Sequence, residues 1–231
     1  NYDYYPKHME KLGGWEKDND YVEYRLDVPE TAPEKYTKIA EMVEKRYNLH
    51  ARKLTKKEIF EGGYGKKLFD LINVTYSHLY GFSELTDRQI DHYVKMYFPL
   101  ADLDLITVIE DGNKDNQLVG LAITIPSLTR ALQKCRRGRL FPFGWWHLLR
   151  AIKFHKTEVV DLLLIGVLPE YRSKGANALV FADLIPRYVK YGFKWGETHV
   201  EMETNESVQS QWGPLDPTMH KKRRCYRKAI G

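Results

Sequence analysis

The chain has 231 residues, enough to bury the core of one large domain or of one domain with an attachment. Its 43% apolar and 29% charged residues are typical of a soluble globular protein, and no apolar run approaches the roughly eighteen residues of a membrane span. A net charge of +5 suits an anionic cofactor, but it would also suit nucleic acid or an anionic membrane surface.

The first part of the chain, residues 1–28, is expected to be an N-terminal tail. It contains a short predicted helix over residues 4–12, a stop at Gly13-Gly14, and a strand over residues 21–28, where YVEYRLDV alternates. One alternative is that this strand pairs with the main sheet.

Residues 29–50 are expected to form a linker and a helix, and residues 51–231 to form the main domain. Helical periodicity and capping residues predict helices over 34–47, 57–79 with an interruption near Gly62-Gly63, and 87–97. Strands are expected over 51–54, 103–110, 118–125, 162–167, 199–203 and 224–229, with a hairpin turn over 111–116 between the second and the third. Pro186 stands inside a further predicted helix, so a bend or an early end is expected there.

The most informative segment contains residues 162–192. An apolar run is followed by the basic loop Arg172–Asn177 and then directly by an amphipathic stretch, an order that predicts strand, loop and helix. The start of a helix carries unpaired backbone N–H groups and a partial positive charge, so it attracts phosphate. Within the loop, Gly175 allows a close backbone approach to a ligand.

Val167-Leu168-Pro169, followed by Arg172-Ser173-Lys174-Gly175-Ala176, resembles the acyl-CoA-binding segment of the GNAT superfamily of acyl-CoA N-acyltransferases. The sixth loop position is Asn177 where that family prefers Gly or Ala, and the small Ala178 follows it. The alternative is an ordinary strand–helix turn with solvated basic residues. The resemblance covers residues 54–230 and implies an α/β fold, with a GNAT-like mixed, mostly antiparallel twisted sheet flanked by helices. The start of the tail resembles the end of a GNAT domain, so an upstream GNAT-like domain is the other alternative for residues 1–28.

The resemblance also implies acetyl-CoA or another acyl-CoA as the acyl donor. The loop would bind its phosphates, and backbone N–H groups of the preceding strand would bond the pantetheine arm and polarise the thioester carbonyl. In GNAT proteins this strand and the next one separate to admit the arm, so the resemblance implies a pocket between residues 162–167 and 199–203. The cofactor-binding residues implied in this way are Ile165, Gly166, Val167, Arg172, Ser173, Lys174, Gly175, Ala176, Asn177 and Asn205. A strand Gly such as Gly166 marks a bulge or a close ligand approach, or else lies beneath a bulky neighbour. A strand-end cap is the alternative role for Asn205.

Four residues are candidates for the proton transfers of catalysis. Asp161 enters the apolar strand, where desolvation would raise the pKa of its carboxyl towards that of a useful base. Glu201 and Glu203 alternate on the next strand and are the second candidates. Trp212 occupies the place where many GNAT members have a proton-donating Tyr, and its indole N–H has no useful acidity. Tyr226 or a water would then protonate the leaving thiolate. Each carboxylate has the alternative role of a solvated charge.

The segment from Leu140 to Phe154 crowds large apolar side chains between basic residues. Three interpretations are open: a helix packed on the domain or on a partner subunit, a lid over an apolar acceptor or acyl pocket, and an interfacial helix on anionic lipid. Burial is expected, because so many exposed apolar groups exceed what soluble monomers usually show.

The sequence therefore predicts an N-acyltransferase that moves an acyl group, with acetyl expected, to an unidentified amine. The acceptor is a small molecule or a peptide, and a homodimer is open. The alternative function is a non-catalytic acyl-CoA-binding or interaction module. Charge runs at 136–139 and 221–224 come without a nucleic-acid-binding motif, so nucleic acid is not expected. Metal-ligand spacings are missing, and Cys135 and Cys225 fit a reduced, cytoplasmic setting.

Overall fold

Helices cover both faces of one sheet, which explains why its central strands are continuous apolar runs in the sequence. The computed structural model describes residues 2 and 4–229, so residues 1 and 3 of the expected tail and residues 230–231 of the expected domain lie outside the described residues. Within them, eight strands form a sheet in the order β2-β3-β4-β5-β6-β1-β7, and β8 pairs with β1. The strands are β1 (Glu16–Asp27), β2 (Leu49–Arg52), β3 (Ile106–Asp111), β4 (Gln117–Pro126), β5 (Val159–Val167), β6 (Trp195–Thr198), β7 (Glu201–Met202) and β8 (Thr218–Arg227).

Five of the described helices pack on the two faces of the sheet. The described α-helices are α1 (Tyr4–Leu12), α2 (Glu34–Tyr47), α3 (Lys56–Phe60), α4 (Tyr64–Tyr76), α5 (Asp87–Tyr97), α6 (Thr129–Gln133), α7 (Gly144–Phe154), α8 (Pro169–Arg172), α9 (Asn177–Tyr191) and α10 (Glu206–Gln209). Helices α2 and α9 share one apolar core with Ile109 of β3, whereas α3, α4 and α5 share another with Val108. Neighbouring residues of a strand point to opposite faces, so one apolar run supplies both cores.

The sheet is antiparallel except where β5 pairs with β6, and α8 and α9 make the crossover between these two strands. A capping box at Thr55 begins α3, and another at Thr86 begins α5. Helix α9 continues through Pro186 to Tyr191, so the expected early end does not occur. The mixed, mostly antiparallel sheet flanked by helices is the predicted fold class.

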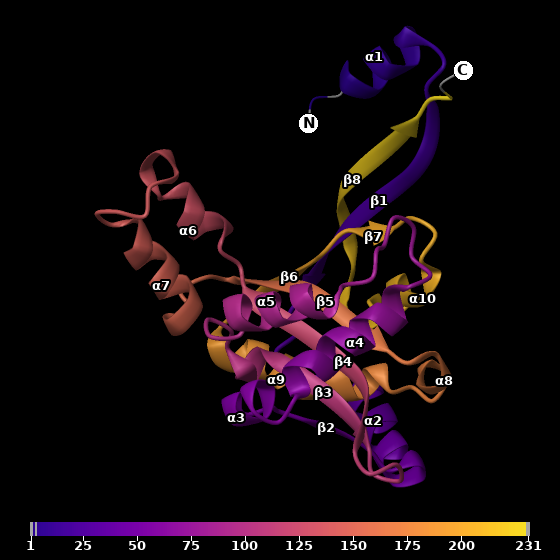
Figure 1. Cartoon of the computed structure of the whole chain (residues 1–231), viewed down its shortest axis with the longest axis vertical. Helices are drawn as coiled ribbons and strands as arrows, with labels where there is room; N and C mark the ends of the chain where they lie inside the picture. The colour runs from indigo at the N-terminus through magenta and orange to yellow at the C-terminus, as the bar shows by residue number, and fades with distance from the viewer. Residues whose placement is uncertain (1, 3, 230–231) are drawn as a thin grey trace.

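The N-terminal segment joins the main sheet, which is one of the alternatives that the sequence leaves open for residues 1–28. Strand β1 pairs with β6, β7 and β8, and Figure 1 shows β1 and β8 rising from the sheet as a long ribbon. The buried Asp20 carboxylate accepts hydrogen bonds from the Arg224 guanidinium at 2.8 and 3.0 Å, which hold its pKa well below the usual range. Glu23 pairs with Arg223 at 2.6 Å, so acidic partners on β1 engage the basic run 221–224.

Candidate functional site

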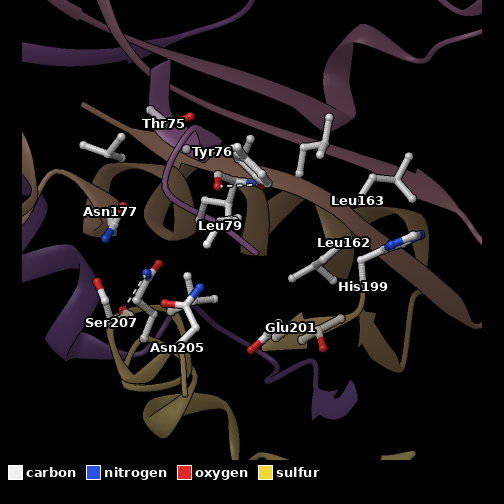
Figure 2. A pocket seen from close by; sticks show the side chains of 18 of the residues that line it. Thr75, Tyr76, Leu79, Leu162, Leu163, Asn177, His199, Glu201, Asn205 and Ser207 are labelled. Atoms are coloured by element: carbon white, nitrogen blue, oxygen red, sulfur yellow. Dashed lines mark hydrogen bonds between the residues drawn. The ribbon is translucent and has the colours of Figure 1, made fainter. Parts of the chain in front are cut away.

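A cavity of about 360 Å³ opens where β5 separates from its neighbour (Figure 2). Pairing between β5 and β6 ends at Leu162 and Thr198, after which β7 turns away to pair with β1. Leu163 is an extra residue in β5 at this point, because Leu162 pairs with Thr124 and Leu164 with Ile123. Such a bulge bends a strand and interrupts its ladder. This is the opening between the 162–167 and 199–203 segments that the GNAT resemblance implies.

The walls of the cavity come from four parts of the chain. They are β5 with residues 122 and 124 of β4 beside it, the end of α4 with the loop after it, helix α9, and the segment 198–212 that contains β7, and Tyr21 of β1 adds to the last of these. Most of the lining is apolar, and it includes Leu79, Phe82, Leu162, Leu163, Leu164, Val180, Phe181, Leu184 and Val208. Among the predicted site residues, the lining contains Ile165, Gly166, Val167, Arg172, Asn177, Glu201 and Asn205.

Glu201 is a carboxylate in this mainly apolar wall. Burial raises the pKa of its carboxyl to about 7, while hydrogen bonds from Trp212 and Thr198 act in the opposite direction. The Trp212 indole is almost fully buried, and its Nε1 donates to both carboxylate oxygens at 3.0 and 3.2 Å. A carboxyl group that titrates near neutral pH can accept or return a proton. Trp212 therefore orients this carboxylate from the place where a proton-donating Tyr was expected.

The other three candidates for proton transfer lie outside the cavity lining in the part of the chain that the structure describes. Glu203 accepts hydrogen bonds from Lys17, at 2.8 Å, and from Lys222, and these lower the pKa of its carboxyl. Tyr226 stands on β8 opposite Lys17. Burial raises the pKa of Asp161 to about 6, opposed by a hydrogen bond from Ser127. The sequence pattern treated Glu201 and Glu203 alike, because it could not show that Lys17 and Lys222 contact Glu203 alone of the two.

One of the β5 backbone N–H groups that were expected to bond the pantetheine arm, that of Ile165, already contacts α4. The Tyr76 hydroxyl donates to the carbonyl of Ile165 at 3.0 Å and accepts from its N–H at 3.2 Å. A Cβ at Gly166 would lie 2.7 Å from Oγ1 of Thr75, so this glycine lets α4 approach β5. Contact with a neighbouring side chain was the alternative explanation that the sequence analysis gave for Gly166, and here that side chain is Thr75. Tyr76 is a site residue that the sequence analysis missed, since nothing local connects it to a strand 89 residues later.

The loop from Arg172 to Asn177 is more closed than expected. The Arg172 guanidinium donates to the carbonyls of Val167 and Thr75, at 3.0 and 3.3 Å. Gly175 has a φ of +83°, and a Cβ there would lie 3.0 Å from Cγ2 of Ile39, so the glycine serves the turn and the packing of α2. Ser173, Lys174, Gly175 and Ala176 are missing from the described residues that line the cavity, whereas Asn177 faces it (Figure 2).

The aromatic segment 140–154 does not form a lid over this cavity, because none of its residues is among the described residues of the lining. Its aromatic side chains are exposed, with Phe141 at 76% and Phe143 at 72%, while Leu148, Leu149 and Ile152 are half-buried. The expected burial is therefore wrong for this chain by itself. Helices α6 and α7 instead stand to one side of the sheet (Figure 1).

No family model matches the chain. It is 22% identical over 167 residues to the bacterial ceramide synthase of Caulobacter vibrioides and 23% identical over 167 residues to protein YghO of Escherichia coli. Each match covers 71% of this chain and 42% of the relative, so the matched region spans less than half of either protein.

Two solved structures share the architecture of the chain. A GCN5-related N-acetyltransferase from Sphaerobacter thermophilus gives a TM-score of 0.59 at 12% identity, over 96% of this chain and 55% of that one. The glucosamine N-acetyltransferase region of a fungal multi-domain β-N-acetylglucosaminidase gives 0.55 at 12% identity, over 96% of this chain and 22% of that one. The chain has the fold of the GCN5-related N-acetyltransferases, the GNAT superfamily that its sequence resembles.

Proposed function

We propose that this domain is an N-acyltransferase that moves an acyl group from acyl-CoA to the amino group of a long-chain, lipid-type amine. The observation that carries this proposal is Glu201, a carboxyl group with a pKa raised to about 7 on the wall of a cavity between separated strands. A purely structural carboxylate would gain nothing from such desolvation, whereas a general base working near neutral pH requires it.

The reaction needs a neutral amine, because a protonated one has no electron pair for attack on a carbonyl. Glu201 would take the proton that the amine loses as the new C–N bond forms. Trp212 would keep the two carboxylate oxygens in place through its bonds of 3.0 and 3.2 Å. The leaving group is a thiol with an ordinary pKa of about 8.5, so breaking the C–S bond needs little help from a protein acid. This fits a site in which Trp212 replaces the expected Tyr.

Acyl-CoA would supply the activated acyl thioester. The residues that fit it are those of β5 and of the start of α9 that line the cavity, with Asn177 at the start of α9 and Asn205 after β7 offering amide groups (Figure 2). The backbone groups of Ile165 that would bond the pantetheine arm are held by the Tyr76 hydroxyl. Binding of the arm at this point therefore requires the Tyr76 side chain to give up its place.

Two observations favour a long-chain amine over a polar acceptor. The lining is mainly apolar, which suits alkyl chains better than an amino acid or a polyamine. One matched relative is named a ceramide synthase, and a ceramide is by definition an N-acylated long-chain amino alcohol.

A panel of acceptors tests the proposal. The chain is incubated with acetyl-CoA or a long-chain acyl-CoA and with a long-chain amino alcohol, an amino acid, a peptide or a polyamine. Release of the CoA thiol and the mass of the N-acyl product are measured. We expect product with the long-chain amine, and its loss in Glu201→Gln but not in the matched Glu203→Gln. Binding of CoA without product for any amine would support the alternative, a non-catalytic acyl-CoA-binding module.

A further inference from the structure

The aromatic arm, residues 129–154 with helices α6 and α7, stands beside the sheet (Figure 1). Its exposed large side chains are Leu132, Leu140, Phe141, Phe143, Trp145, Trp146 and Phe154. Among the described residues, no helix is both long and apolar enough to cross a bilayer. The apolar side chains of the arm therefore lie on the surface of the domain and do not belong to a membrane-spanning helix among the described residues.

The arm is an ordered structure and not a loose loop. Gly144 lies so close to the turn before it that a Cβ there would be 2.3 Å from the carbonyl oxygen of Arg139. Cys135 is buried against this glycine, and the Trp145 N–H donates to the Leu140 carbonyl at 2.8 Å. Just past α7, the His155 ring stacks on Tyr191 at 3.9 Å. The exposed rings are therefore attached to a backbone that is packed and hydrogen-bonded within the arm.

The charge of the molecule is concentrated on the same segment. Residues 127–157 contain no Asp or Glu and eight basic residues, which are Arg130, Lys134, Arg136, Arg137, Arg139, Arg150, Lys153 and Lys156. The whole chain has a net charge of +5, so the remaining residues sum to 5 − 8 = −3. The positive field therefore belongs to this segment and not to the whole surface.

A second cavity of about 360 Å³ lies between α6, α7 and the end of α9. Its lining includes Arg130, Lys134, Arg150 and Lys156, and Glu158 is the one carboxylate among the described lining residues. Several cations around one hollow match the charge of a phosphodiester. The arm thus combines a hollow lined by cations, which fits anionic headgroups, with apolar side chains that can enter the bilayer interface next to those headgroups.

We propose that the aromatic arm docks this domain on a bilayer that contains anionic phospholipids. The exposed aromatic and aliphatic side chains enter the interface, and the surrounding cations meet lipid phosphates. A second copy of the chain is a poor occupant, because a symmetric dimer through this surface would bring two sets of eight cations together. The docking does not depend on the proposed catalysis, because it uses no residue of the cavity between β5 and β7.

Vesicle sedimentation tests the docking without acyl-CoA or an acceptor. The chain is mixed with vesicles of phosphatidylcholine alone or with added phosphatidylglycerol. We expect binding to the anionic vesicles, weakened about fivefold for each arginine replaced and so on the order of a hundredfold in R136Q/R137Q/R139Q. The matched control, K35Q/K45Q/R46Q, removes the same charge from the exposed side of α2 and should keep wild-type binding.

The apolar half of the surface has its own variants. F141S/F143S should lose binding although both side chains are exposed and the fold does not need them, whereas Leu100→Ser, at a position 60% exposed outside the arm, should keep it. Trp145 and Trp146 are 45% and 42% exposed, so iodide should quench them in the free protein and anionic vesicles should shield them.

Three outcomes would overturn the docking. They are no binding of the wild-type chain to anionic vesicles, equal weakening by the α2 control, and a dimer in sedimentation velocity that F141S/F143S abolishes without any vesicle binding. The last outcome would assign the surface to a second copy of the chain.

Discussion

The cavity between β5 and β7 and the aromatic arm depart from the usual distribution of side chains in opposite directions. In the cavity, the Glu201 carboxyl is buried among apolar groups, and in the arm, large aromatic rings face solvent among cations. Burying a charge and exposing an apolar patch both cost free energy. The comparison supports the two proposals made above, which are proton transfer in the cavity and membrane contact through the arm.

The largest expected effect concerns the cavity. Glu201→Gln keeps the shape of the side chain and removes its basicity, so the rate of acyl transfer should fall roughly 10²–10⁴-fold. In the wild type the rate should rise as the pH increases through about 7, where Glu201 loses its proton. Rates with saturating acyl-CoA measure both effects.

Asp161→Asn and Glu203→Gln make the same chemical change at carboxylates outside the cavity lining and should lower the rate less. If Asp161→Asn had the larger effect, Asp161 would be the group that takes the proton from the amine, and the role given to Glu201 would be wrong.

The next effect is on stability. Burial raises the pKa of Glu201 from an ordinary 4.5 to about 7, so between these pH values the folded protein keeps a proton that the unfolded chain has lost. The free energy of unfolding therefore falls as pH rises through this window, by up to about 3 kcal/mol, and Glu201→Gln removes that loss. Urea unfolding at pH 5 and pH 8 should show that the free energy of unfolding of the variant, relative to that of the wild type, is greater at pH 8. A difference between the two proteins that does not change with pH would mean that this carboxyl is not desolvated.

A smaller effect is expected where α4 contacts β5. Tyr76→Phe leaves the N–H and the carbonyl of Ile165 without their partner, so the free energy of unfolding should fall by about 1–2 kcal/mol. The affinity for CoA should be kept or increased, because a pantetheine arm would find these groups free. Tyr97→Phe, at a position of α5 that is 58% exposed and outside the cavity lining, is the control. Calorimetry that showed weaker CoA binding in Tyr76→Phe would mean that the hydroxyl itself holds the cofactor.

The smallest effect is expected in the arm. F141S/F143S changes two side chains that are 76% and 72% exposed, so the free energy of unfolding should change by no more than about 0.5 kcal/mol. Phe181→Ser, in the core beside the cavity, should cost about 3–5 kcal/mol. Thermal unfolding of the two variants compares them directly. A large loss in F141S/F143S would show that the rings pack on another part of the protein.

Local patterns in the sequence determined the order of the elements and the fold class. The strand, basic loop and helix of residues 162–192 and the caps at Thr55 and Thr86 depend on neighbours a few residues apart, so they could be predicted. The cavity between the 162–167 and 199–203 segments followed from the family that this pattern resembles. The sequence therefore located this cavity and named Glu201, on its second segment, as a candidate base.

Only the tertiary structure decided which polar groups meet. Tyr76 bonds Ile165 across 89 positions and Arg224 bonds Asp20 across 204, and no periodic pattern encodes such pairs. The same limit applies to Glu201 and Glu203, because their surroundings come from Trp212 in one case and from Lys17 and Lys222 in the other. The aromatic arm was expected to be buried on composition alone, but burial needs a partner surface, and none of the described residues covers its aromatic side chains. A sequence states which groups are present, whereas long-range packing sets their solvation and hence their chemistry.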